Sequence, residues 1–125
     1  MFKMGMCYLE GRNVEKNPYF AFKYFKDSAE YYPLSDIKLG ICYLFGYGVD
    51  VDEKLAFKIL SRYNDTVVGN NESLYYLAYC YEFGKGTKID YKKAMFYYDL
   101  ASSSETITFN NSIEYNRCVN KLSKL

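Results

Sequence analysis

A cysteine that returns at a nearly constant interval constrains this chain more than any other feature. Cys7, Cys42, Cys80 and Cys118 are separated by 35, 38 and 38 residues. The first three stand in the same block, in which a Cys-Tyr pair is followed by two further residues and then glycine. A fixed period of this length is the signature of a repeat architecture, in which each unit buries its apolar face against its neighbours. The sequence therefore predicts a stack of similar units.

Each unit is predicted to be a pair of helices joined by a short turn. Glycine at a helix end lets the chain turn through positive φ without steric cost. An Asn or Asp six residues later can cap the free N–H groups of the next helix, and a small Ala lets a neighbouring helix come close. The recurring structural positions are Gly11 and Ala21, then Gly40, Gly46, Gly48 and Ala56, then Gly84, Gly86 and Ala94, with caps at Asn17, Asp52 and Asp90.

Apolar residues at i, i+3 and i+4 after each cap support this interpretation. Residues 110–125 are predicted to form half a repeat that caps the stack, and Asn111 with Glu114 resembles a capping box at the start of its helix. The full repeats are predicted to run roughly over residues 1–32, 33–70 and 71–109 of a single domain. The predicted helices span residues 2–10, 18–31, 34–45, 53–63, 72–83, 91–102 and 111–123.

Charge and chain length limit the possible partners. The 125 residues carry 16 Lys and Arg against 15 Asp and Glu, so electrostatics alone predict neither a nucleic-acid nor a membrane partner. Arg117, Lys121 and Lys124 form a small basic stretch, which we interpret as a solvated helix end that suits the helix dipole. The first residues do not resemble a signal peptide and no window is apolar enough to span a bilayer, so we expect a cytoplasmic protein.

Several residue types speak against catalysis. The chain has no histidine, which removes the commonest general base and metal ligand. The four cysteines hold one shared repeat position, so we interpret them as small buried packing residues rather than a metal site or redox switch. Acidic residues such as Asp52 and Glu53 lie at helix starts, where they suit the dipole. We predict no catalytic residue, no metal, no cofactor and no enzymatic activity.

The repeat pattern resembles a known family. Leu39-Gly40-x-Cys42-Tyr43-x-x-Gly46-x-Gly48, followed by Asp52 and Ala56, is similar to the Sel-1-like repeats, which are relatives of the tetratricopeptide repeats. The third unit repeats the pattern with Ala78 in place of the first glycine, and the first unit has Asn13 in place of the second. The resemblance implies an all-α, right-handed solenoid of antiparallel helix pairs. Members of this family typically serve as adaptors that assemble protein complexes without catalysis.

Tyrosine is the most informative part of the composition, because the chain has 16 of them and 9 phenylalanines. Tyrosine joins a large apolar face to a hydrogen-bonding tip, which suits binding surfaces. Those at repeat positions, such as Tyr43 and Tyr81, are interpreted as structural. The tyrosines outside the pattern are the predicted partner-binding residues, namely Tyr19, Tyr47, Tyr75, Tyr76, Tyr79 and Tyr91.

The leading hypothesis is a non-catalytic scaffold or adaptor that binds a peptide or helix of a partner protein on the first helices of each pair. The alternative is a small accessory or regulatory subunit of a large assembly, such as a ribosome or another ribonucleoprotein particle. The shortened first helix and the basic C-terminal stretch motivate that alternative. End-to-end self-association through Phe2, Met4 and Met6 is a further possibility for the uncapped N-terminus.

Overall fold

The computed structural model describes residues 17–65, 70–102 and 108–124. Within these ranges the chain forms six α-helices and one short 3-10 helix. It divides into two compact units, one ending at Ile59 and the other beginning at Leu60. The predicted helix at residues 2–10, Cys7, Gly11 and the proposed self-association residues Phe2, Met4 and Met6 lie outside the described residues.

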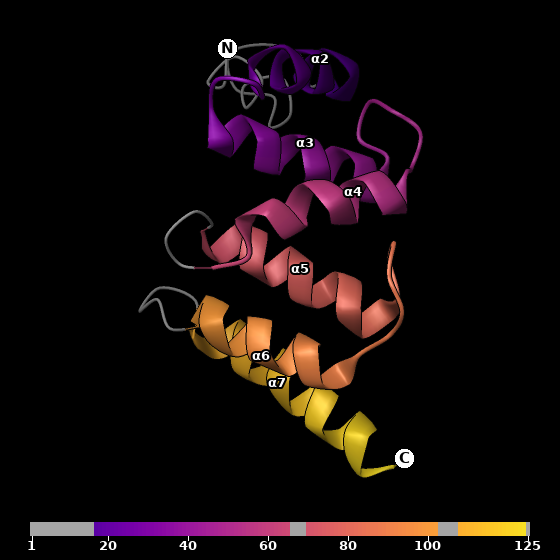
Figure 1. The fold of residues 1–125 in the computed structure, drawn as a ribbon, viewed down its shortest axis with the longest axis vertical. Helices are drawn as coiled ribbons and strands as arrows, with labels where there is room; N and C mark the ends of the chain where they lie inside the picture. Colours follow the sequence, from indigo (N-terminus) through magenta and orange to yellow (C-terminus); the bar gives the residue numbers. More distant parts are fainter. Residues whose placement is uncertain (1–16, 66–69, 103–107, 125) are drawn as a thin grey trace. The chain divides into compact units, whose positions relative to one another are not determined.

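The first unit contains α2 (Pro18–Ser28), α3 (Pro33–Phe45) and all but the last residue of α4 (Glu53–Leu60) (Figure 1). The side chain of Asn17 accepts a hydrogen bond from the Phe20 N–H at 3.2 Å, which confirms the predicted cap. Helix α2 ends at Ser28, so the prediction that it continues to residue 31 is wrong. The Tyr32 N–H donates back to the Ser28 carbonyl, and Tyr32 is extended because it precedes proline.

The core of the first unit is made by side chains from all three of its helices. Ala21 and Phe25 of α2 are fully buried, and they cluster with Cys42 of α3 and Ile59 of α4. Ala56 is also fully buried. Burial raises the pKa of the Cys42 thiol to about 11, so at neutral pH it is a protonated apolar group. Small side chains at these positions let the helices approach closely.

The turn from α3 to α4 follows from two glycines and one aspartate. Gly46 adopts φ 76° and its N–H donates to the Cys42 carbonyl at 2.8 Å. Gly48 also has positive φ, and a Cβ added there would lie 2.8 Å from Tyr19 Cα, so this close approach requires glycine. The Asp52 side chain then accepts the Leu55 N–H at 3.1 Å at the start of α4. The predicted aspartate cap is confirmed.

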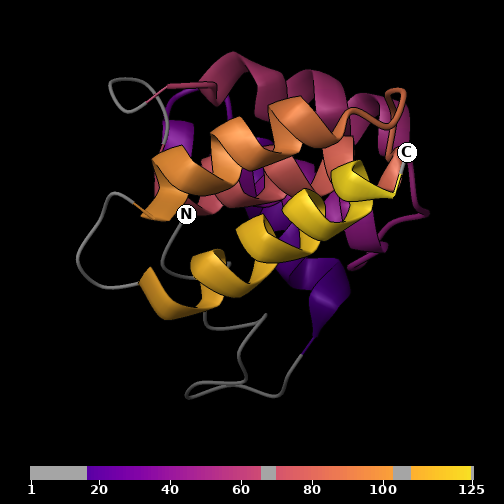
Figure 2. The ribbon, with the colours of Figure 1, turned by 90° about the horizontal axis from the view of Figure 1, so that it is seen from below.

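The second unit contains the 3-10 helix η1 (Ser61–Tyr63), α5 (Asn71–Phe83), α6 (Tyr91–Ser102) and α7 (Thr108–Ser123). Helix α6 packs against both α5 and α7, and Figure 2 shows α6 and α7 running side by side in opposite directions. The turn from α5 to α6 repeats the geometry of the first unit. Gly84 and Gly86 have positive φ, and the Asp90 side chain accepts the Lys93 N–H at 3.1 Å.

The core of the second unit gathers Ala78, Ala94, Tyr98 and Cys118, all fully buried. Cys80 is fully buried as well, and burial raises the pKa of the Cys118 thiol to about 11. Each described cysteine is thus a packing residue in a closely packed interior. Low thiolate content makes such thiols poor nucleophiles.

Helix α7 begins earlier than predicted. It starts at Thr108, so Asn111 lies inside the helix and the predicted capping box is wrong. Glu114 is used differently, because its side chain accepts a hydrogen bond from the Tyr75 hydroxyl of α5 at 2.8 Å. Asn116 and Asn120, farther along α7, are exposed. In the repeat register they correspond to the buried Gly40 and Leu44 of α3, so α7 presents polar groups where α3 presents apolar ones.

Candidate protein-binding surface

Three aromatic side chains follow one another along α5 at helical spacing. Tyr76, Tyr79 and Phe83, here called the aromatic strip, recur at i, i+3 and i+7 and so share one face of the helix. The ring centroids of Tyr76 and Tyr79 are 6.4 Å apart, and those of Tyr79 and Phe83 are 4.9 Å apart. The two tyrosines are half-buried and Phe83 is 41% exposed. Contact between neighbouring rings restricts the rotation of each one.

The other side of α5 explains why the strip lies at the surface. Leu74, Leu77 and Ala78 are buried at 1% exposure or less, and they fill the interior of the unit. An amphipathic helix that buries these residues turns the positions between them outward. The strip is therefore a part-exposed aromatic face, and apolar surface of this kind is often used for contacts with other molecules.

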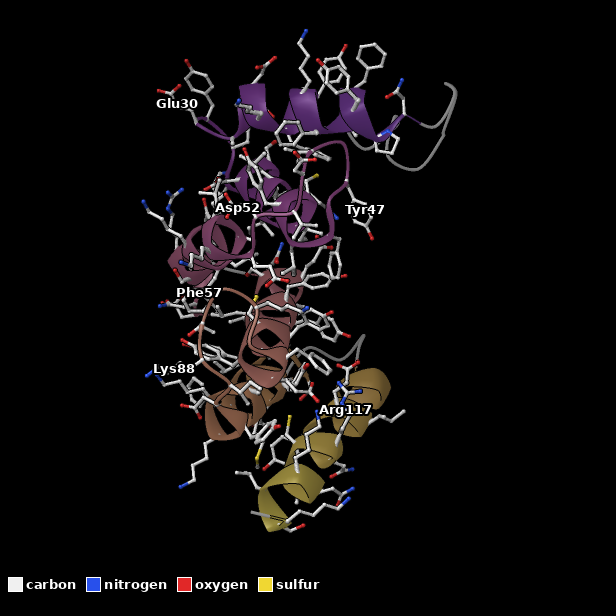
Figure 3. All side chains as sticks on the ribbon, turned by 90° about the vertical axis from the view of Figure 1, so that its right-hand side faces the viewer. Glu30, Tyr47, Asp52, Phe57, Lys88 and Arg117 are labelled. Atoms are coloured by element: carbon white, nitrogen blue, oxygen red, sulfur yellow. The ribbon has the colours of Figure 1, made fainter. Side chains whose placement is uncertain are left out.

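A buried carboxylate lies on α5 next to the strip. The Glu82 side chain is 0% exposed and accepts hydrogen bonds from the Tyr98 hydroxyl at 2.7 Å, the Arg117 guanidinium at 2.7 Å and the Lys121 ammonium at 3.0 Å. Figure 3 shows Arg117 on the side of α7 that faces α5. Side chains from α6 and α7 thus converge on one residue of α5. We call these four residues the Glu82 network.

The network keeps Glu82 ionised despite its burial. Burial alone raises the pKa of a carboxyl group, but hydrogen bonds from Arg117, Tyr98 and Lys121 outweigh it and lower the Glu82 pKa below its usual value. Burial also raises the pKa of Tyr98, and the hydrogen bond to Glu82 raises it further. A buried carboxylate is tolerated only when its oxygens are satisfied in this way.

The same two cations join the network to the strip. Arg117 lies over the Phe83 ring at 5.5 Å from its centroid, and Lys121 lies over it at 4.7 Å. Lys121 also lies 5.4 Å from the centroid of Tyr91. Contacts of a cation with an aromatic face are attractive at these distances. The end of the strip is therefore held from α7 by charged groups whose own positions are set by Glu82.

This arrangement corrects the interpretation of the basic stretch as a solvated helix end. Arg117 and Lys121 are paired with Glu82, whereas Lys124 is exposed. Two of the three charges that motivated the ribonucleoprotein alternative are thus used inside the second unit. That alternative loses this support.

The six tyrosines predicted to face a partner are distributed over both units. Tyr75, Tyr76 and Tyr79 come together on α5, where the Tyr75 and Tyr76 rings meet edge to face at 5.0 Å. Tyr91 shares Lys121 with Phe83. Tyr19 is 61% exposed and Tyr47 is 42% exposed, both in the first unit.

Sequence reasoning missed Phe83, Glu82 and Arg117. A signal for Glu82 and Arg117 was present, because Glu82 occupies the repeat position of the buried Leu44, and Arg117 and Lys121 are four residues apart on the last helix. A charged residue at a core position implies a partner of opposite charge.

In the ranges that the structure describes, no group of three or more His, Cys, Asp or Glu side chains is placed to hold a metal ion. None of the helices in these ranges is long and apolar enough to cross a bilayer.

Comparison with known proteins agrees with the repeat pattern. The Sel1 repeat family model matches residues 1–30, 33–62 and 71–105. No curated protein sequence matches the chain. Sel1 repeat proteins generally act as scaffolds for protein interactions, without catalysis of their own.

Two solved structures are similar in fold. One is a Sel1 repeat protein from Oxalobacter formigenes, with a TM-score of 0.66 and 26% identity over 82% of this chain and 42% of that one. The other is a protective antigen of uropathogenic Escherichia coli strains that displays an SLR fold, with a TM-score of 0.75 and 24% identity over 91% of this chain and 24% of that one. This chain therefore spans less than half the length of either protein. The predicted all-α repeat fold is confirmed, and the chain belongs to the Sel1 repeat family.

Proposed function

We propose that this chain is a non-catalytic protein-interaction module that binds a segment of a partner protein across the aromatic strip of α5. The observation that carries the proposal is the row of part-exposed rings at Tyr76, Tyr79 and Phe83. Tyr75 borders the row and Tyr91 lies beside its far end. The scaffold role that is general in the family supports the same conclusion.

Physical arguments favour binding at this row. Tyrosine and phenylalanine have two side-chain torsions, so they offer a large contact area at a small cost in conformational entropy. Here the rings already pack on one another, and two cations hold Phe83, so little further ordering is needed when a partner docks. Arg117 keeps 40% of its side chain exposed and is oriented by Glu82. Tyrosine and arginine are, with tryptophan, the residues enriched among those that dominate the energy of protein interfaces.

The test uses a photo-crosslinking amino acid at one position per variant. Phe83 in the strip is compared with Phe96, a 59% exposed phenylalanine on α6 of the same unit. Irradiation in cells that express the full chain should give a discrete protein adduct from position 83 and none of that size from position 96. Equal labelling from both positions would contradict the proposal.

A second measurement uses the protein identified by crosslinking. Tyr79→Ala with Phe83→Ala should weaken its binding by about a hundredfold, because each aromatic anchor of an interface contributes about 1–2 kcal/mol. Phe96→Ala is the matched control and should leave binding unchanged. Circular dichroism of all the variants separates a loss of contact from a loss of fold.

A further inference from the structure

A hollow in the surface lies beside the turn from α5 to α6. Ile89, Asp90, Tyr91, Lys92 and Leu122 line an open volume of about 390 Å³ between the start of α6 and the last turns of α7. Ile89 is 54% exposed there. Figure 3 shows Lys88 beside this turn on the side of the unit opposite to Arg117. The hollow meets the Glu82 network at Lys121, which lies 5.4 Å from the ring centroid of the lining residue Tyr91.

The hollow combines an apolar floor with positive charge at its rim. Ile89 lies close to the turn backbone, since a Cβ added to Gly84 would lie 3.0 Å from Ile89 Cγ1. Residues 84–93, here called the basic turn, contain four lysines and one aspartate. The carboxylate of that aspartate, Asp90, already accepts the Lys93 N–H. Lys88 and Lys92 are exposed.

The fold does not require Lys88, whose counterpart in the first unit is Asp50, whereas Lys92 has a lysine counterpart, Lys54. The corresponding residues 46–55 of the first unit, here called the acidic turn, have Asp50, Asp52 and Glu53 with one lysine, Lys54. Both turns have two glycines with positive φ and an aspartate that caps the next helix. Val51 of the acidic turn is 55% exposed, as its counterpart Ile89 is 54% exposed. The same backbone therefore forms with either sign of charge.

Local energetics even oppose one lysine of the basic turn. Lys92 and Lys93 lie in the first turn of α6, where the helix dipole makes positive charge unfavourable by about 0.3–1 kcal/mol each. For Lys93 the contact with the Tyr81 ring, at 5.3 Å from its centroid, offsets this cost, so Lys92 is the lysine that opposes stability. Residues that oppose local stability are often kept for function. An exposed aliphatic side chain next to Lys88 in the sequence, and lining one hollow with Lys92, suits a ligand with carboxylates around one apolar group.

We propose that the hollow is a second docking site, which takes an acidic segment of a partner protein with a single aliphatic or aromatic side chain at its centre. The apolar side chain contacts Ile89 and Leu122, and the carboxylates on either side of it lie near Lys88 and Lys92. This site adjoins the aromatic strip at Tyr91, which lines the hollow and shares Lys121 with Phe83.

The test measures fluorescence anisotropy of the full chain with synthetic peptides of about twelve residues. The probe has Glu and Asp around one central Leu, and its controls replace that Leu with Ser or all the acids with Lys. We expect the probe to bind, the Ser peptide to bind about fivefold more weakly and the Lys peptide not to bind. Lys88→Glu with Lys92→Glu should weaken the probe at least about tenfold, because two rim charges are reversed.

Matched variants make the outcome specific. Lys54→Glu changes the residue of the acidic turn that corresponds to Lys92, and it should leave the probe's affinity unchanged. Tyr76→Ala, about two helical turns before Phe83 in the aromatic strip, should also leave it unchanged, which separates this site from the strip. Ile89→Ser should lower the affinity for the probe about fivefold, as replacement of the central Leu of the peptide with Ser does. Thermal unfolding of each variant shows that the fold is retained.

Three results would overturn the proposal. The first is failure of the Leu probe to bind at low salt. The second is equal binding of the Leu and Ser peptides together with no effect of Ile89→Ser, which would mean attraction of any polyanion. The third is stronger binding of phosphatidylserine vesicles, with the same dependence on Lys88 and Ile89, which would identify a membrane surface instead of a protein segment.

Discussion

The acidic turn of the first unit and the basic turn of the second share one backbone and display opposite charge. In both, two glycines with positive φ end one helix and an aspartate caps the next. The shared geometry depends on these glycines and on the capping aspartate, whereas the residues between them differ between the two turns. The repeat therefore determines the position of each side chain in the turn but not its residue type.

The interiors of the two units differ in the same way. Leu44 of α3 is 4% exposed, and its counterpart on α5 is Glu82, which is 1% exposed. The second unit accommodates the charge because α6 and α7 supply Tyr98, Arg117 and Lys121. A shared backbone position can therefore be apolar in one repeat and ionic in the next, provided that its neighbours change with it.

Exchanging these two residues gives the largest expected effect. Leu44→Glu buries a carboxylate in the first unit without an arranged set of donors, and we expect the free energy of unfolding to fall by about 4 kcal/mol or more. Glu82→Leu leaves the Tyr98 hydroxyl without its acceptor but frees two part-exposed cations to meet water, so we expect about 2 kcal/mol. Urea unfolding at pH 7 measures the free energy of unfolding of both variants. Equal losses from the two substitutions would refute the difference between the units.

The two glycine positions of these turns should differ in their tolerance of alanine, Gly48 holding one position and Gly84, the counterpart of Gly46, the other. Gly48→Ala places a Cβ against the backbone of Pro18 and Tyr19 and strains a residue with φ 73°, so we expect a loss of about 3 kcal/mol. Gly84→Ala meets only the flexible Ile89 side chain and the Thr87 carbonyl at ordinary distance, so its cost should be the φ strain of about 1–2 kcal/mol. Thermal unfolding measures the loss of stability in both variants, and a larger loss for Gly84→Ala than for Gly48→Ala would contradict this prediction.

Acid should weaken the second unit through Glu82. Because the folded pKa of Glu82 lies below its usual value of 4.5, its stabilising contribution is complete above that value. The contribution is lost as the pH falls through the folded pKa. Glu82→Gln should therefore cost about 2 kcal/mol at pH 7 and progressively less below pH 4.5. Urea titrations of both proteins across this range test the sign, and a difference that grows in acid would contradict it.

The smallest expected effect concerns Lys92. Lys92→Glu replaces a cation with an anion in the first turn of α6, so we expect the free energy of unfolding to rise by about 0.5 kcal/mol. Chemical denaturation at low salt measures the change, and high salt should reduce it. A loss of stability would mean that the lysine serves the fold, which removes one argument for the second docking site.

Most helix boundaries could be predicted because they depend on local chemistry. Asn17, Asp52 and Asp90 cap helices where the spacing placed them, and Gly46 and Gly84 end helices through positive φ. These residues act within four positions of themselves, so the sequence alone reveals them.

Long-range contacts were the part that local spacing did not reveal. Glu82 and Arg117 are 35 residues apart in sequence, and only the packing of α7 onto its unit brings them together. Glu114 was interpreted as part of a helix cap because that contact is local, yet Tyr75 lies 39 residues from it and donates to it. The aromatic strip was predicted in part, since tyrosine composition suggested binding, but Phe83 was assigned no role.

The Glu82 carboxylate restricts how the repeats of this chain can be recombined by protein engineering. A helix grafted after α6 must bring cations to the positions of Arg117 and Lys121, and a copy of α3 would bring Ile41 and Phe45 instead. In such a chimera the Glu82 carboxylate would be buried without a paired cation, although every junction would match the repeat length. Glu82 therefore limits which repeats can directly follow this one, because the next helix must supply cations that pair with its carboxylate.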